Sequence, residues 1–101
     1  MTVNDSYHRN SETGMLSSGV KTADVAIKAE AGKVYWLTVY ASAAAVIGLA
    51  DSLTNSTTYK WKITKGTTTD GHYIFDPPIE FATGIWLDVV SGTADVVIGY
   101  V

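Results

Sequence analysis

Hydrophobic and polar residues alternate along most of this chain, and the pattern is clearest at its C-terminal end. There the runs 85–90 and 94–101 are largely apolar at alternate positions, and Ser91-Gly92-Thr93 separates them. A period of two is typical of β-strands that bury one face. A short connection with a central glycine favours a hairpin, and a lone hairpin is only marginally stable in water. We therefore expect the rest of the chain to supply the sheets against which this hairpin packs.

The same alternation predicts further strands in the preceding part of the chain. They cover residues 20–30, 33–40, 45–51, 59–64, 71–76 and 79–83. Helix competes with strand in the alanine-rich segment 41–51. Gly48 is unfavourable inside a helix and strands bracket the segment, so we predict a strand over 45–51. Pro77 and Pro78 are expected to end the strand before them, because a proline cannot donate to a β-ladder.

The number and spacing of these elements predict the fold class. Seven to eight strands with turns about 8–12 residues apart are typical of an all-β fold, here a single small antiparallel β-sandwich or a jelly-roll-like barrel. We assign this domain to residues 20–101. Residues 1–19 hold too few apolar groups to offset the entropy of ordering, so we interpret them as a flexible, polar N-terminal arm. The arm is either a frayed terminus or a segment that orders on a neighbouring subunit through Tyr7, Met15 and Leu16.

Composition and charge narrow the classes of partner. The 101 residues are 47% hydrophobic and only 17% charged, which indicates one domain with a packed core. The net charge is −3 and the basic residues are scattered, so we expect neither a nucleic-acid nor a membrane partner. The first residues lack the apolar core of a signal peptide, and no run reaches the roughly 20 apolar residues of a membrane span. The absence of cysteine excludes disulfides and thiolate chemistry.

Candidate catalytic and metal-binding residues are few. His72 lies close after Asp70, and a carboxylate can polarise an imidazole, but no serine, cysteine or second acid stands at a recognisable motif spacing. A solvent-exposed turn histidine is the simpler interpretation. Acids near predicted strand ends could surround calcium, but they lack the dense spacing of a dedicated loop, and no histidine pair suits zinc. We therefore predict a protein that is not an enzyme, with no catalytic residue, no metal site and no cofactor.

Aromatic residues are numerous for a domain of this size. Core packing accounts for Tyr59, Trp61, Tyr73 and Phe75. By contrast, Trp86 lies on the strand face opposite Leu87, and Trp36 and Tyr40 lie on the face opposite Leu37. One two-layer core cannot easily bury both faces, so these tryptophans are covered by the arm or loops, buried in a subunit contact, or stacked on a sugar. We predict Trp36, Tyr40 and Trp86 as interface anchors.

Four segments together resemble a known class of proteins. They are the glycine-led run 32–40, the run 45–51 that ends in aspartate, the Pro-Pro segment 75–89, and the closing Gly-Thr-Ala run 92–100. Their order is similar to that of the small all-β virion proteins of tailed bacteriophages, over about residues 25–101. The alanine-rich segment 41–45 and the polar arm depart from that pattern.

The resemblance implies a function without catalysis. Such proteins are typically capsid decoration (cement) proteins or other head and tail accessories, and they are often trimeric. It therefore implies the phage major capsid protein or another virion protein as partner, and a homo-oligomer with a trimer favoured. The location would be the phage head surface, after synthesis in the host cytoplasm. The alternative, from another class, is a carbohydrate-binding or adhesion module associated with a tail or fibre, which would use exposed tryptophans.

Overall fold

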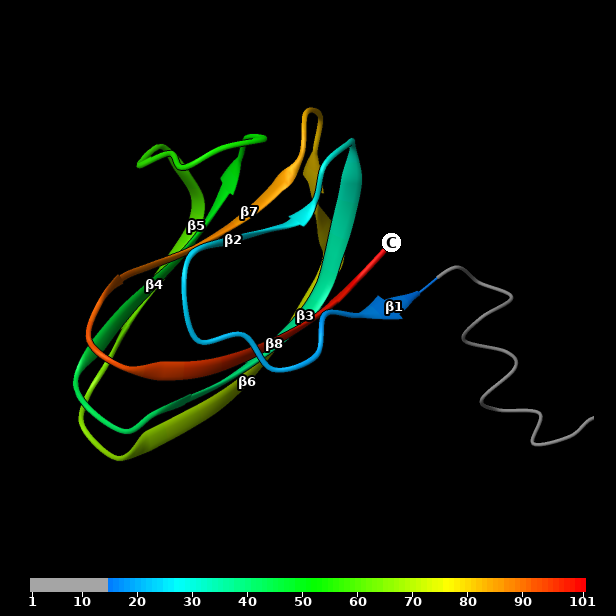
Figure 1. Ribbon diagram of the computed structural model, residues 1–101. Helices are drawn as coiled ribbons and strands as arrows, with labels where there is room; N and C mark the ends of the chain where they lie inside the picture. The colour runs from blue at the N-terminus through cyan, green and yellow to red at the C-terminus, as the bar shows by residue number, and fades with distance from the viewer. Residues whose placement is uncertain (1–14) are drawn as a thin grey trace, which may run out of the picture.

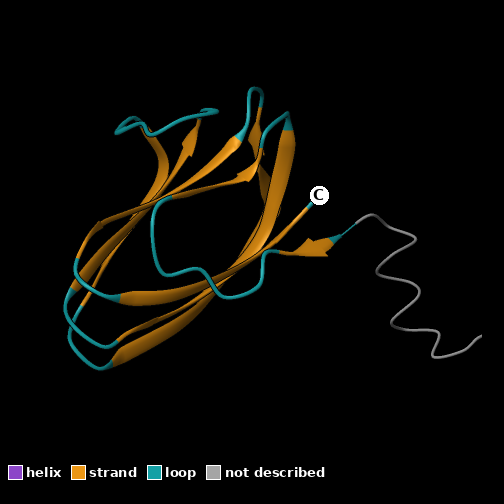
Figure 2. Ribbon diagram, in the orientation of Figure 1, coloured by secondary structure: helices purple, strands orange, loops and turns teal. Residues whose placement is uncertain are grey.

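The computed structural model describes residues 15–101, which form strands and turns without a helix. Eight strands build two antiparallel four-stranded sheets (Figures 1 and 2). The strands are β1 (Leu16–Ser17), β2 (Val25–Lys28), β3 (Gly32–Ala41), β4 (Ala45–Asp51), β5 (Tyr59–Lys65), β6 (Thr69–Phe81), β7 (Ile85–Ser91) and β8 (Ala94–Tyr100). Sheet A has the order β1-β8-β3-β6 and sheet B the order β2-β7-β4-β5. The predicted all-β sandwich is confirmed.

The connections between the strands give the sandwich its topology. Every connection except the one between β4 and β5 passes from one sheet to the other. With two such interleaved sheets of four strands, the order is that of a jelly roll. Jelly rolls serve unrelated functions, so the function of this chain has to be argued from its surface.

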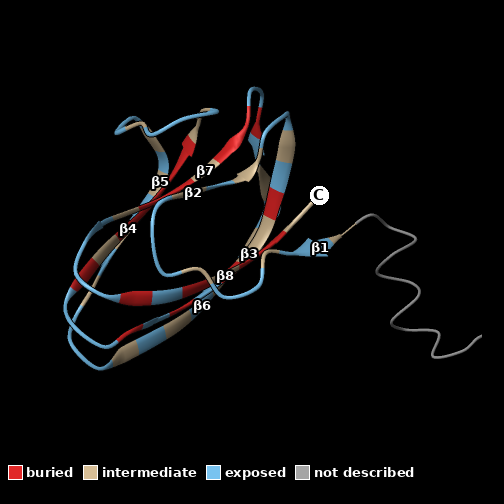
Figure 3. Cartoon of the chain, in the orientation of Figure 1, coloured by how far each residue is buried: buried red, intermediate tan, exposed pale blue. Residues whose placement is uncertain are grey.

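The core lies between the two sheets and takes alternate residues from most of their strands. Buried and exposed positions alternate along β8, for example (Figure 3). The largest fully buried side chains are Val34, Leu37, Val39, Ile47, Leu49, Phe81, Ile85, Leu87, Val96 and Ile98. Full burial of a side chain of this kind contributes on the order of 1.5–3 kcal/mol before entropy is subtracted. The period of two therefore identified the core-facing positions of these strands.

The predicted C-terminal hairpin is wrong. β7 pairs with β2 and β4 in sheet B, whereas β8 pairs with β1 and β3 in sheet A. Residues 91–93 therefore carry the chain across the core, and β7 and β8 lie in different layers (Figure 1). Gly92 has a φ of 80°, and a Cβ there would lie 1.9 Å from the Ala44 carbonyl oxygen. The glycine is thus required by the connection, although the connection is not a hairpin.

The expectation that the two prolines end a strand is also wrong. β6 runs without a break from Thr69 to Phe81 and includes Pro77 and Pro78, with a cis bond before Pro77. β6 is at the edge of sheet A and pairs only with β3. Its register with β3 shifts between Val34 and Trp36, opposite the prolines. Edge strands and bulges are the places where a sheet accepts proline.

The first predicted strand is shorter in the structure than expected. Only Val25–Lys28 of the predicted strand 20–30 is a strand. The preceding residues cross from sheet A to sheet B, and Lys21 bridges to Val96 on the way. Residues 15–19 belong to the predicted arm, and Leu16–Ser17 within them pairs with the end of β8. Residues 1–14 of that arm, with Tyr7, lie outside the described residues.

The end of β4 fixes the connection between β6 and β7. The Asp51 carboxylate accepts hydrogen bonds from the backbone N–H groups of Ala82 (3.0 Å), Thr83 (2.7 Å) and Gly84 (3.2 Å). Hydrogen bonds to a carboxylate stabilise its charged form. The bonds from Ala82 and Thr83, ahead of all other contributions, lower the pKa of Asp51 below its ordinary value.

Candidate functional site

The outer face of sheet A gathers exposed aromatic and aliphatic side chains. Trp36 and Tyr40 alternate along β3 with the buried Leu37 and Val39, so they point away from the core, as predicted. Pairing with β6 adds two residues that the sequence pattern did not connect to them. Ile74 is the Cα partner of Trp36, and His72 is the partner of Thr38. We call the set Trp36, Tyr40, His72 and Ile74 the aromatic face.

Trp36 is held in place by its own sheet. Its indole lies over Gly99 of β8, where a Cβ would come within 2.1 Å of the ring. The rings of Trp36 and His72 lie 5.8 Å apart at an angle of 40°. His72 Nδ1 is hydrogen-bonded to Thr38 Oγ1 at 2.6 Å. The indole is therefore half-buried, with Gly99 beneath it and His72 beside it.

Tyr40 and Ile74 are the exposed members of the aromatic face. The exposed fraction is 43% for Tyr40 and 71% for Ile74. Tyr40 has Asp70 of β6 and Asp95 of β8 as its two Cα partners, so acidic residues flank this end of the face. Single exposed hydrophobic residues are ordinary, but a run of them beside a positioned indole is typical of a contact surface.

Trp86, the third predicted anchor, lies on the opposite side of the molecule. It projects from β7 on the outer face of sheet B, with Ala26 and Ala50 as Cα partners. The residue is half-buried, and its Nε1 is buried with no hydrogen-bond partner among residues 15–101. The structure therefore brings Trp36 and Tyr40 together but does not bring Trp86 to them.

The two described anchors of the arm lie at the margin of sheet A. Met15 is half-buried, and Leu16 in β1 is 54% exposed. Leu16 is the Cα partner of Tyr100, on the edge of the sheet opposite β6. β8 and β3 separate it from Ile74 in the sheet, whereas the Trp36 ring lies over Gly99, the Cα partner of Ser17 in β1.

A polar pair of half-buried Tyr59 and buried Asp88 lies near Trp86 and was not predicted. The Tyr59 hydroxyl donates a short hydrogen bond to the Asp88 carboxylate, which is only 5% exposed. The ring of Tyr59 lies over Gly48, where a Cβ would come within 2.5 Å of it. The hydrogen bond to Asp88, together with burial, raises the pKa of Tyr59 to about 12. The one signal in the sequence was an aspartate within an otherwise apolar strand.

Tyr59 also corrects an expectation about the core. The sequence assigned Tyr59 to the core together with Trp61, Tyr73 and Phe75. The register of β5 with β4 shifts between Leu49 and Ala50, which moves Tyr59 to the outer face. Trp61, Tyr73 and Phe75 do pack against the core, as predicted.

In the structure, His72 of the candidate catalytic pair is hydrogen-bonded to Thr38. Asp70 and His72 both project from the outer face of β6, and the hydrogen bond of the His72 ring is made with Thr38. Among residues 15–101, no group of three or more histidine and acidic side chains is arranged to hold a metal ion. The described residues also include no helix that is long and apolar enough to cross a membrane.

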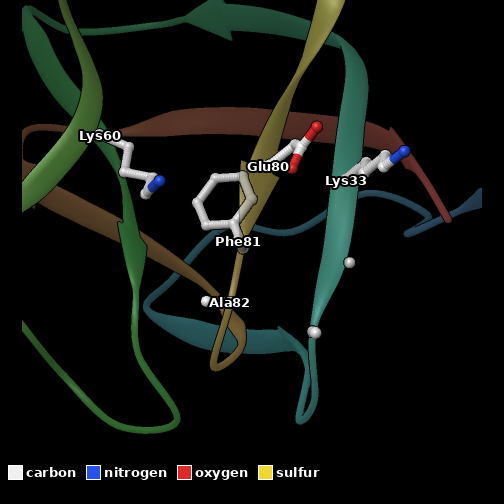
Figure 4. A pocket seen from close by; sticks show the side chains of 7 residues that line it. Lys33, Lys60, Glu80, Phe81 and Ala82 are labelled. Carbon is white, nitrogen blue, oxygen red and sulfur yellow. The ribbon is translucent and has the colours of Figure 1, made fainter.

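An open groove lies between β5 and the Gly32 end of sheet A (Figure 4). Its volume is about 470 Å³, and it is lined by Ala31, Gly32, Lys33, Lys60, Glu80, Phe81 and Ala82. The Lys60 ammonium lies 5.9 Å from the centre of the Phe81 ring, and Lys33 lies on the other side of that ring (Figure 4). The groove thus combines an aromatic floor with two positive charges and one carboxylate.

Comparison of the chain with protein-family models, with curated proteins and with solved structures finds no match.

Proposed function

We propose that this chain is a non-enzymatic structural protein of a phage virion, most specifically a capsid decoration protein that binds across capsid subunits. The observation that supports this proposal is the aromatic face. It presents Tyr40 and Ile74 to solvent beside an indole that the sheet already holds in position. Aromatic side chains are enriched in protein interfaces, and a positioned ring loses little conformational entropy when it binds.

The proposed mechanism is the addition of buried area. Each copy would cover a junction between subunits of the major capsid protein or another virion protein on the head surface. A standard interface buries about 800 Å² on each partner. Many such contacts, linked through a homo-oligomer, resist separation of the shell even where each contact is weak. The flanking Asp70 and Asp95 would then form part of a polar rim around the aromatic face.

Co-sedimentation with capsids of the phage that encodes the chain tests this proposal. The wild-type protein should pellet with the capsids, and Ile74→Lys should weaken binding about tenfold or more, because a charge would be buried at the contact. Val90→Lys is the matched control, since Val90 is 46% exposed but belongs to β7 in sheet B. Both variants should keep the far-ultraviolet circular dichroism of the wild type. Equal binding of Ile74→Lys and Val90→Lys, or no binding of the wild type, would contradict the proposal.

A carbohydrate-binding or adhesion module is the second candidate, and the surroundings of Tyr40 favour it. Asp70 and Asp95 flank the tyrosine. An aromatic ring can stack on a sugar while neighbouring carboxylates accept hydrogen bonds from the sugar hydroxyl groups. On this alternative, polysaccharide quenches the fluorescence of Trp36, and Tyr40→Ala abolishes the quenching. Unchanged fluorescence across a glycan panel would exclude this candidate.

A further inference from the structure

The sandwich has four sheet edges, and they are protected to very different degrees. On one side of the molecule the edge strands are β1 and β2, which have only two and four residues. On the other side they are β5, with seven residues, and β6, with thirteen. An edge strand leaves a row of backbone N–H and C=O groups without partners, and such a row can pair with a further strand. The longest row belongs to β6.

Only part of β6 is protected against such pairing. Pro77 and Pro78 remove two backbone donors from its second half. The first half, Thr69 to Phe75, contains no proline and pairs on one side only, with β3. Ile74 lies in this half and has the largest exposed fraction, 71%, among the exposed large hydrophobic residues. An added strand would cover Ile74 and extend the aromatic face beyond the present edge.

The inner side of the β6 edge has lysines of β5 near it, with Glu80 close to Lys60. β5 lies across the core from β6 and carries Lys60, Lys62 and Lys65. The Lys65 ammonium donates to the Tyr73 hydroxyl of β6 at 2.9 Å and lies 5.5 Å from the centre of that ring. Lys60 lies near the Phe81 ring of β6 in the same way. Aromatic side chains of β6 therefore hold Lys65 beside the first half of the strand and Lys60 beside its last residue.

This charge decides which kind of strand fits. In a strand added to β6, side chains alternate between the two faces of sheet A. Along the first half of β6, those on the outer face would meet Ile74, and those on the inner side would meet Lys65. A second copy pairing through β6 about a two-fold axis would place two β5 strands side by side, so the lysines of both copies would repel each other. Carboxylates on the inner side would instead complement them.

We propose that the first half of β6 is a strand-addition site for an extended segment of a partner protein in which aliphatic and acidic residues alternate. The segment would pair with the free edge between Thr69 and Phe75, place its aliphatic residues next to Ile74, and direct a carboxylate toward Lys65, which contacts Tyr73. This inference deepens the proposed function, on which it rests for the partner being a virion subunit.

Binding of synthetic peptides to the full chain tests the site. The probe is the peptide acetyl-Thr-Val-Glu-Val-Glu-Val-Thr-amide, and its counterpart has lysine in place of both glutamates. The first peptide should bind, more weakly as salt is raised, and should shift the backbone amide NMR signals of residues 69–75. The lysine peptide should bind at least tenfold more weakly. Equal affinity of the two peptides, or shifts confined to another surface, would overturn the proposal.

Two lysine variants test whether the charge of Lys65 itself is needed for peptide binding. Lys65→Gln should weaken binding of the acidic peptide about fivefold. Lys28→Gln should leave it unchanged, since Lys28 is also half-buried but belongs to β2 on the far side of sheet B. Equal losses in both variants would refute the role of the β5 lysines. The peptide assay needs no capsids, so absence of peptide binding together with intact capsid binding would refute this site alone.

Discussion

The hydrogen bond from half-buried Tyr59 to buried Asp88 gives the sharpest prediction for stability. Tyr59→Phe keeps the ring that lies over Gly48 and removes only the hydroxyl that donates to Asp88. The Asp88 carboxylate, 5% exposed, would then lose this donor while remaining buried. A buried acceptor without a partner costs about 1–3 kcal/mol, and a charged one costs more, so we expect a loss of about 3 kcal/mol.

The loss should be visible in both thermal and denaturant unfolding. For a domain of this size, about 3 kcal/mol lowers the melting temperature by roughly 12–24 °C. Urea unfolding followed by tryptophan fluorescence should show a lower midpoint with an unchanged slope, which marks a change in stability alone. The native fold should persist, because the packing of the ring is retained.

Two further variants decide whether the hydrogen bond is the cause. Tyr40→Phe removes a hydroxyl from an exposed tyrosine and should change stability by less than about 0.5 kcal/mol. The double variant Tyr59→Phe with Asp88→Leu removes both polar groups and should recover part of the loss, because no buried acceptor is left unpaired. A loss in Tyr59→Phe no larger than that in Tyr40→Phe would refute the reasoning.

Three other predictions concern pH and backbone geometry. The pKa of Tyr59 is raised from 10.0 to about 12, so its contribution to the free energy of unfolding is complete below pH 10.0 and is lost as pH rises through about 12. Phenolate absorbance should therefore show a tyrosine that titrates late. Because the pKa of Asp51 is lowered, its contribution to the free energy of unfolding is present above pH 3.8 and is lost as pH falls through its pKa in the folded state. In urea titrations at different pH values, Asp51→Asn should therefore reduce the loss of stability at acid pH. Gly92→Ala should cost roughly 1–3 kcal/mol in urea unfolding. Gly66→Ala should be nearly neutral, because its Cβ would only make an ordinary contact with Thr69 Cγ2 at 3.9 Å. Similar losses in the two variants would contradict the role assigned to the connection at 91–93.

The sequence alone determined the all-β class and, for most strands, which residues face the core. A strand with one buried face must be apolar at every second position, so Leu37 and Val39 could be separated from Trp36 and Tyr40 without coordinates. The outward direction of both aromatic residues is confirmed, and so is the strand over 45–51. These features depend on local chemistry and on burial, which the order of residues records directly.

Only the tertiary structure decided which strands are neighbours. The apolar faces of β7 and β8 have the same pattern whether the strands pair in one sheet or face each other across the core, and the structure places them in different sheets. Strand pairing also joined Ile74 and His72 to Trp36, and a register shift moved Tyr59 out of the core. Likewise, prolines interrupt a central strand but not an edge strand such as β6. Pairing, register and edge position depend on contacts between distant residues, and the period of a single strand carries no record of them.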